Sequence, residues 1–318
     1  MLKSLLSFGK PPKTDTDTKQ QNGSSNGSNN YIFPKVDPAV DGPDCDKDCA
    51  DCTIKYPSRF KVNTIKEMYG GVKPFAKHVL VATGKSDWAE KVHREEGSLM
   101  EAFKQGPFEA KDGHMTVLAS NMSVEPHVDD DQERTTSVLV LPSFVFVDSM
   151  TPTRIPEFMD RFVDSTEQAQ QLPTTTAHVN GDEKTQSIPT QLTSRPCLRD
   201  CVVLLCSHKR RDARCGISAP LIKRELERQL RPLGLYRDED DQRPGGVGIF
   251  FVSHVGGHKF AANVLIYRKA EEQMIWLARV RPQDCEGIVK HTVLNGKVVH
   301  PEYQLRGGFD MKKGLTSW

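Results

Sequence analysis

The chain has 318 residues, with 43 basic and 42 acidic side chains and a formal net charge of +1. This balance gives no overall field that would recruit nucleic acid or an anionic membrane, so we expect neither as a partner. The chain has no apolar run of about eighteen residues and no secretory hydrophobic region, which predicts a soluble intracellular protein. Its length predicts two globular units together with some disordered sequence.

Residues 1–42 are predicted to form a disordered tail. After MLKSLLSFGK the sequence becomes a Thr, Asp, Gln, Gly, Ser and Asn tract up to about Asn30, which cannot bury enough apolar surface to fold. A mitochondrial presequence is the alternative interpretation, but the segment lacks Arg and has Asp15 and Asp17 soon after its short apolar stretch. A cytoplasmic location is therefore predicted, with the mitochondrial matrix as the alternative.

An α/β domain is predicted over residues 43–165. HVLVATG, from His78, reads as a buried strand, and SDWAEKVHREEGSLMEAFKQG reads as a helix with Ser86 as its N-cap. MTVLASNM and TSVLVLPSFVFVDSM supply further strands around a polar segment at 129–131, and IPEFMDRFV forms a second helix. Strands that alternate with helices indicate an α/β unit.

A polar linker or long loop is predicted over 166–195, where large apolar side chains are almost absent. A second α/β domain follows over 196–310, and 311–318 is a C-terminal tail. CVVLLC predicts a buried strand, and APLIKRELERQLRPLGL predicts a helix capped by Ser218, with Pro220 in its first turn. The strands VGIFFV, AANVLIYR and MIWLARV and the helix PQDCEGIVKHTVLNG complete the order of a thioredoxin-like domain. The two halves of the chain can share this plan, although no internal repeat is obvious.

The eight cysteines indicate reduced thiols, metal ligands or redox groups rather than a disulfide framework, because intracellular thiols stay reduced. The CDKDCADC segment has C-x3-C-x2-C spacing, which suits a metal site or a regulatory disulfide. Its missing fourth ligand favours surface thiols in an acidic loop instead. Cys197 and Cys201 are interpreted as spare thiols near a metal site. Cys285 is interpreted as a core residue on an amphipathic helix.

Two pairs of soft or borderline donors follow two strands of the second domain. Eight residues separate Cys206 from Cys215, and three separate His254 from His258. The preceding strands are expected to be neighbours in one sheet, so both loops open onto the same edge. Two thiolates and two imidazoles complete either a tetrahedral zinc site or the outer positions of a two-iron cluster. The long C-x8-C loop is unlike a compact zinc knuckle, whose cysteines lie about two to four residues apart.

The sequence around these pairs supports ligation. Cys215 is placed just before a helix cap, where unpaired amides favour the thiolate. The intervening loop carries four cations that are expected to raise the potential near the sulfurs: Lys209, Arg210, Arg211 and Arg214. Gly256 and Gly257 allow close backbone approach to an inorganic centre. Taken singly, two cysteines at a strand end are ordinary buried thiols and a His-x3-His pair is an exposed loop or helix pair, so ligation is inferred only from their combination.

The C-x8-C loop, HVGGHKFAAN and the thioredoxin-like order resemble the sucrase/ferredoxin-like family, from about Cys45 to the end of the chain. That resemblance implies two thioredoxin-like α/β lobes, the second a thioredoxin-like ferredoxin domain. It implies a 2Fe-2S cluster held by four residues: Cys206, Cys215, His254 and His258. His254 and His258 replace a Cys-x3-Cys pair of ordinary thioredoxin-like ferredoxins. The paired catalytic carboxylates of a glycosidase are not evident, despite the family name.

These features predict a one-electron carrier or redox sensor rather than a catalyst with its own substrate; its redox partner is not identified. Two imidazoles in place of two thiolates remove negative charge from the cluster, so its reduction potential is expected to rise above that of a plant-type ferredoxin. An imidazole also retains a nitrogen that titrates, so reduction is coupled to proton uptake. The alternatives are a zinc-stabilised interaction module and a thiol-dependent oxidoreductase. The latter lacks C-x-x-C at a strand-to-helix junction.

The chain ends in Leu-Thr-Ser-Trp. This resembles the C-terminal tripeptide by which clients are recognised by the cytosolic iron–sulfur assembly targeting complex. Ser317 and Trp318 fit that pattern, whereas Thr316 stands where a larger apolar residue is typical. The resemblance implies this complex as a partner through Trp318. The alternative is a frayed terminus.

Overall fold

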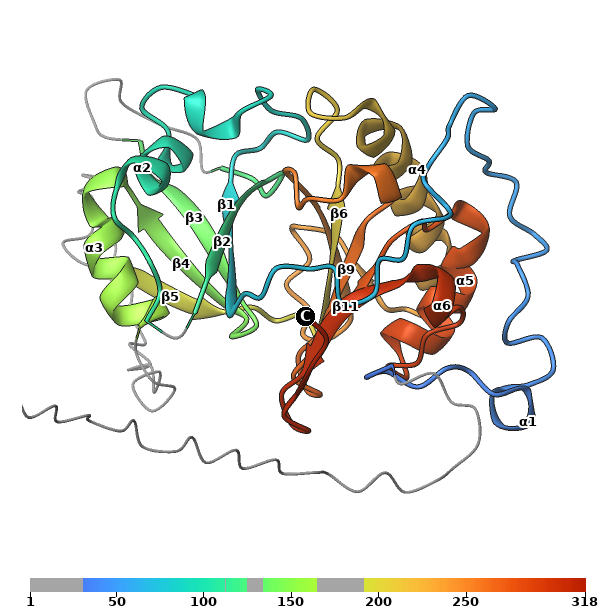
Figure 1. Ribbon diagram of the computed structural model, residues 1–318. Coiled ribbons are helices and arrows are strands. Elements are labelled where there is room, and N and C mark those ends of the chain that lie inside the picture. Colours follow the sequence, from blue (N-terminus) through green and yellow to red (C-terminus); the bar gives the residue numbers. More distant parts are fainter. Residues whose placement is uncertain (1–30, 112, 125–133, 165–191) are drawn as a thin grey trace, which may run out of the picture. The chain divides into compact units, whose positions relative to one another are not determined.

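The computed structural model describes residues 31–111, 113–124, 134–164 and 192–318 (Figure 1). Within these ranges, the chain from Tyr31 to Trp318 forms one compact unit. The proposed presequence, most of the predicted 166–195 linker and the polar segment at 129–131 lie outside the described residues. None of the helices in the described ranges has the length and apolar composition needed to cross a bilayer.

The first lobe is a strand-helix-strand unit followed by a hairpin and a helix. β1 runs parallel to β2 and antiparallel to β3, and β3 pairs with β4. A further strand, β5, adds to β4. The strands are β1 (Lys77–Ala82), β2 (Met115–Ser120), β3 (Thr136–Leu141), β4 (Val145–Met150) and β5 (Thr193–Pro196), and the helices are α2 (Leu99–Gln105) and α3 (Ile155–Phe158). The chain continues from α3 as a π-helical turn over Met159–Val163.

The second lobe repeats this order. β6 runs parallel to β8 and antiparallel to β9, and β9 pairs with β10. The repeated elements are β6 (Cys201–Cys206), α4 (Ala213–Leu230), β8 (Val247–Val252), β9 (Val264–Arg268), β10 (Gln273–Leu277) and α5 (Cys285–Gly287), with α5 continuing as a π-helical turn over Ile288–Val293. The additional elements are α1 (Pro38–Asp41), β7 (Tyr236–Arg237), α6 (Pro301–Gln304), β11 (Leu305–Asp310) and β12 (Leu315–Thr316).

The two lobes share one twelve-stranded sheet. The strand orders β2-β1-β3-β4 and β8-β6-β9-β10 are the same, and this order confirms the predicted pair of thioredoxin-like α/β lobes. The lobes meet where β2 pairs antiparallel with β8, through Ser120 and Val252. Ala82 pairs with Ser120 on one side and Cys206 pairs with Val252 on the other. Ala82 is therefore the counterpart of Cys206 in the first lobe.

Alternating side chains divide the core into layers, because successive strand residues point to opposite faces. In the first lobe Val79 and Val81 pack with α2 and α3, and in the second lobe Val203 and Leu205 pack with α4. Figure 1 shows these helices against their own strands. The intervening strand residues of both lobes meet in a third cluster, which includes Leu80, Leu139, Leu204 and Leu265. The lobes thus share a core as well as a sheet.

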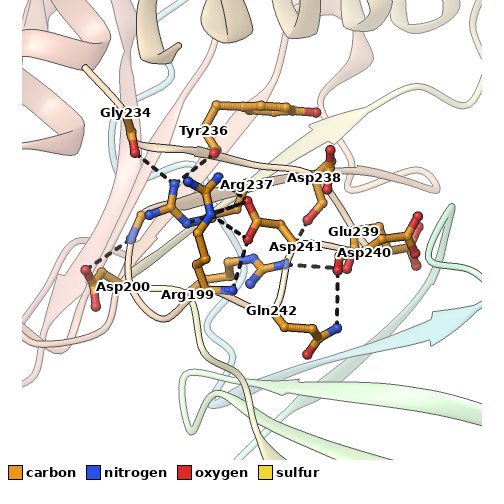
Figure 2. Close-up of polar contacts among 12 residues, drawn as sticks. Arg199, Asp200, Gly234, Tyr236, Arg237, Asp238, Glu239, Asp240, Asp241 and Gln242 are labelled. Carbon is orange, nitrogen blue, oxygen red and sulfur yellow. Dashed lines mark hydrogen bonds and ion pairs between the residues drawn. The ribbon is translucent and has the colours of Figure 1, made fainter. Parts of the chain in front are cut away.

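A polar network fixes the start of β8 relative to β6 (Figure 2). The Asp200 carboxylate accepts a hydrogen bond from the Gly246 amide at 3.2 Å, and the Asp200 amide donates to the Gly246 carbonyl at 3.0 Å. In the connecting loop, the Arg199 guanidinium donates to the Asp238 carbonyl at 2.8 Å. This network holds the register that brings the other ends of β6 and β8 together.

Both described chain ends pack on the second lobe. Residues 31–42 were expected in a disordered tail, yet Phe33 is 1% exposed and the Val36 amide donates to the Val298 carbonyl. Apolar side chains that are isolated in a polar sequence anchor this segment. At the other end, β12 pairs with β11, and Trp318 packs against Phe75 and Phe309 with ring centroids 5.3 and 6.0 Å apart.

The helix predicted from Ser86 is shorter than expected. A 3-10 turn spans Val92–Arg94, and α2 begins only after Ser98, whose hydroxyl accepts a hydrogen bond from the Glu101 amide. Gly97 lies between the two with φ +70°. That left-handed conformation interrupts a helix and suits glycine.

Candidate metal centre

The four predicted ligands lie at the carboxyl ends of two adjacent parallel strands. Cys206 is the last residue of β6, and it pairs with Val252, the last residue of β8. His254 follows β8 by two residues, and His258 begins a 3-10 turn that leads to β9. The expectation that the two strands are neighbours is therefore confirmed.

Cys215 lies inside a helix rather than before its cap. α4 begins at Ala213, because the Asp212 carboxylate accepts a hydrogen bond from the Arg214 amide at 2.9 Å and caps the helix. Ser218, the predicted cap, lies within α4 with its hydroxyl donating to the Cys215 carbonyl, and Pro220 is also internal. The aspartate starts the helix earlier than the Ser-Pro signal indicated. Cys215 thus occupies the first turn, near the positive end of the helix dipole.

The two thiols are buried together. Cys206 and Cys215 are at most 1% exposed, and they pack with Ala261 beneath Phe60 and Val255. A hydrogen bond from the Cys215 thiol lowers the pKa of Cys206, despite burial, and His254 and the Val255 backbone add to this effect. The pKa of Cys215 is raised by the same hydrogen bond and by burial. The environment therefore favours a thiolate at Cys206.

The two imidazoles lie side by side with unused nitrogen atoms. The ring centroids of His254 and His258 are 5.1 Å apart. In both residues Nδ1 is buried and has no hydrogen-bond partner among the described residues. Burial lowers the pKa of His258, although Asp212 lies 3.9 Å from its Nε2. Because buried nitrogen atoms are seldom left without a partner, this pair calls for a ligand.

The donor set has the composition that a two-iron cluster with two cysteine and two histidine ligands would need. Within the described ranges, no three His, Cys, Asp or Glu side chains are arranged around a single metal ion. The four residues instead form a thiol pair and an imidazole pair, which meet where Cys206 contacts His254. A two-iron cluster in which two histidines replace two cysteines on one iron requires this division of donors.

Arg306 supports the histidine loop, although sequence reasoning did not single it out. The side chain is buried, and its Nη1 donates to the Gly256 carbonyl at 3.0 Å and to the Asn263 side chain at 3.1 Å. Burial lowers the pKa of Arg306 to about 10, so it remains charged. A Cβ on Gly257, which has φ +69°, would lie 2.6 Å from the guanidinium carbon. The only signal in the sequence is an arginine within the otherwise apolar strand LRGGF.

The cationic loop before Cys215 is largely paired with acidic groups. Arg210 lies 3.7 Å from Asp87, Arg211 lies 3.6 Å from Glu90, and Arg214 lies 2.7 Å from Asp212. Asp87 and Glu90 come from the first lobe, a contact that local sequence did not reveal. The predicted positive potential of this loop is thus partly offset, whereas Arg306 contributes a buried positive charge.

The N-terminal thiols are buried, so their interpretation as surface thiols was wrong. Cys45 packs with Val36 and Val299, apart from the other two. Cys49 accepts a hydrogen bond from Arg228 at 3.4 Å, and the Cys52 thiol donates to the Ile54 carbonyl at 3.5 Å. Burial raises the pKa of all three thiols. They therefore behave as packed neutral thiols.

The remaining cysteines lie away from the candidate centre. Cys201 begins β6, about 16 Å along an extended strand from Cys206, and burial raises its pKa to about 12. The Cys197 amide pairs with the Phe144 carbonyl at the same end of the sheet. The prediction that these two thiols lie near the centre was wrong. Cys285 is fully buried, which confirms its placement in the core.

Comparison with known proteins gives a family and several relatives. The sequence model of the sucrase/ferredoxin-like family matches residues 68–307. Actin patches distal protein 1 of Saccharomyces cerevisiae is 36% identical over 158 residues, which cover 50% of this chain and 46% of that protein. Altered inheritance of mitochondria protein 32 of Clavispora lusitaniae is 26% identical over 268 residues, which cover 82% of this chain and 92% of that protein. No solved structure gives a significant match.

Proposed function

The chain belongs to the sucrase/ferredoxin-like family, and on that premise we propose that it is a redox protein with a 2Fe-2S cluster held by Cys206, Cys215, His254 and His258. It acts as a one-electron carrier or redox sensor rather than as a catalyst with its own substrate. One observation carries the proposal: a buried thiol pair meets an imidazole pair whose two Nδ1 atoms have no partner among the described residues.

The chain's own residues set the electrostatics of this site. When bound, the cluster supplies a one-electron couple. His254 and His258 are neutral donors, so they bring less negative charge than two thiolates would. The buried guanidinium of Arg306 adds a positive charge that interacts with Cys206. Both effects favour the reduced state and raise the reduction potential above that of an all-cysteine site.

The same residues control access to water and protons. Phe60, Val62 and Val255 cover the thiols. The side chain of His258 is 39% exposed, so the edge of the site formed by the imidazoles reaches solvent. We therefore expect reduction to be coupled to proton uptake at an imidazole nitrogen, with a potential that falls as pH rises.

Replacement of a histidine by cysteine tests the assignment. His258→Cys should add a thiolate and lower the reduction potential on the order of 0.1 to 0.2 V, as measured by protein-film voltammetry. His300→Cys, at a position remote from the four ligands, is the control and should leave the potential unchanged. If His258→Cys, like the control, keeps the reduction potential of the unaltered protein, His258 is not a ligand.

The location and the assembly partner are further parts of the proposal. We propose a cytoplasmic protein, with the mitochondrial matrix as the alternative; the name of the Clavispora lusitaniae relative refers to the inheritance of mitochondria. The C-terminal Trp318 is proposed to engage the cytosolic iron–sulfur assembly targeting complex. Because Trp318 packs on Phe75 and Phe309, engagement requires its release. Deletion of Trp318 should lower iron content in eukaryotic cells and leave chemical reconstitution unchanged; equal iron content in cells would exclude this route.

A further inference from the structure

A cavity of about 910 Å³ adjoins the candidate metal centre. It lies on the first lobe, and the second lobe contributes His208, Arg211, Ser253 and His254 to its wall. His254 is thus shared between the centre and the cavity. We call this space the His254 cavity. Its volume is that of a site for a drug-sized ligand or a mononucleotide.

The wall of the His254 cavity combines apolar and cationic side chains with two carboxylates, Glu90, which pairs with Arg211, and Glu109. Met100, Phe103 and Phe108 line one part of it, and the rings of Phe103 and Phe108 stand edge to face at 6.2 Å. Lys91 and Lys104 line another part, are exposed, and have no ion-pair partner in the described part of the chain. Apolar rings suit a planar aromatic group, and unpaired lysines suit an anion such as a phosphate.

His208 supplies a buried acceptor. Its side chain is 1% exposed, and Nε2 lies 3.2 Å from the Trp88 carbonyl and 2.9 Å from the Ala89 carbonyl. Two carbonyl neighbours require Nε2 to carry the proton, so Nδ1 is an acceptor. That Nδ1 is buried and has no partner among the described residues. Since buried nitrogen atoms normally have a hydrogen-bond partner, a donor group on a ligand in the cavity would supply the partner that Nδ1 lacks.

We propose that the His254 cavity binds a planar aromatic anion with a ring N–H donor, of the flavin mononucleotide type. The ring lies against Phe103 and Phe108, the phosphate meets Lys91 and Lys104, and a ring N–H meets Nδ1 of His208. The role of this ligand as the redox partner of the centre, through contact with His254, rests on the proposed function.

The test is a titration of the anaerobically purified full chain with flavin mononucleotide, followed by quenching of flavin fluorescence and by calorimetry. We expect saturable binding at one site, at least tenfold weaker binding of riboflavin, which lacks the phosphate, and at least tenfold weakening in the Lys91→Glu/Lys104→Glu double variant. Lys312→Glu, an exposed charge reversal outside the cavity, should change nothing. His208→Gln, which retains polar groups, should weaken flavin mononucleotide and riboflavin by the same factor.

The outcomes separate this proposal from the proposed function. Absence of flavin mononucleotide binding to protein that contains iron overturns the cavity proposal and leaves the cluster intact. Binding to protein that contains no iron supports the cavity and contradicts the cluster. Binding that the double lysine variant does not weaken also overturns the cavity proposal.

Discussion

The two lobes have the same strand order but different residues at the ends of their strands. Ala82, Ser120, Val252 and Cys206 are paired in a row across the sheet. In this row Ala82 of the first lobe occupies the position that Cys206 occupies in the second. After β2 the chain continues with Asn121 and Met122, whereas after β8 it continues with Ser253 and His254. The first lobe therefore lacks donors at the positions where the second has them.

This difference separates the role of the fold from that of the loops. Both lobes supply parallel strands with coincident carboxyl ends, which is where functional groups gather in α/β sheets. In the described part of the chain, the thiol pair and the imidazole pair both follow strands of the second lobe. The first lobe instead contributes support: Asp87 and Glu90 pair with the loop before Cys215, and the Trp88 and Ala89 carbonyls orient His208.

The largest expected effect comes from removing the donors of the second lobe. Cys206→Ser/Cys215→Ser should reduce iron from about two atoms per chain to near zero, because serine hydroxyls are poor ligands for iron–sulfur clusters. Cys197→Ser, a buried thiol at the opposite end of the sheet, is the matched control and should keep its iron. Iron and sulfide analysis of both variants tests this prediction. Equal iron content in the two variants would show that Cys206 and Cys215 are not the ligands that distinguish the second lobe from the first.

A second comparison uses one left-handed glycine from each lobe. Gly84 has φ +63° with nothing within 4 Å of an added Cβ, whereas Gly257 has φ +69° and faces Arg306. Gly84→Ala should cost about 1 kcal/mol from backbone strain alone. Gly257→Ala should cost about 3 kcal/mol, because the buried guanidinium must also move. Denaturant unfolding measures both values; equal costs would show that Arg306 does not constrain the histidine loop.

A third prediction concerns the core that the lobes share. His78 on β1 shares a hydrogen bond of 2.6 Å with the Tyr267 hydroxyl on β9. Burial lowers the pKa of His78 from the ordinary 6.5 to about 3. Because the unfolded chain binds this proton more tightly than the folded protein, the depressed pKa costs nothing above pH 6.5, and stability is lost as pH falls from 6.5 towards 3. Between pH 8 and pH 5 the loss should be about 2 kcal/mol.

The control for this pH dependence is His78→Gln, which should flatten the stability profile between pH 8 and pH 5. His300→Gln should leave the profile steep. Unfolding free energies at several pH values test this prediction, and an equally steep profile in His78→Gln would assign the acid sensitivity to another group.

The smallest expected effect concerns the C-terminus. Trp318→Ala removes the aromatic contacts with Phe75 and Phe309 and should cost about 1 kcal/mol. Leu315→Ala, at a side chain that is 41% exposed, should change stability by less than about 0.5 kcal/mol. Thermal unfolding compares the two variants. Equal melting temperatures would mean that Trp318 contributes nothing to the shared core.

Strong local patterns made the strands and the donor pairs predictable. HVLVATG and CVVLLC became β1 and β6 because continuous apolar runs are typical of strands buried on both faces. The convergence of the two donor loops followed from parallel pairing of their strands. The spacing of the donors, their strand context and the family resemblance were together enough to propose the site.

Features that depend on distant residues were not predictable. The cap of α4 was assigned to Ser218, although Asp212 offered the earlier start. The pairing of Arg210 and Arg211 requires the first lobe, and the support from Arg306 requires β11, so neither has a local signature. The burial of Cys45, Cys49 and Cys52 likewise depends on packing against the second lobe rather than on the acidic sequence around them.

The central claim is that Cys206, Cys215, His254 and His258 hold a two-iron cluster. Its most direct test is iron, zinc and acid-labile sulfide analysis of the full chain purified without oxygen, together with electron paramagnetic resonance before and after reduction. The account predicts about two irons and two sulfides per chain and a paramagnetic signal only after one-electron reduction. Protein that contains neither iron nor sulfide, or that contains zinc alone, would contradict it.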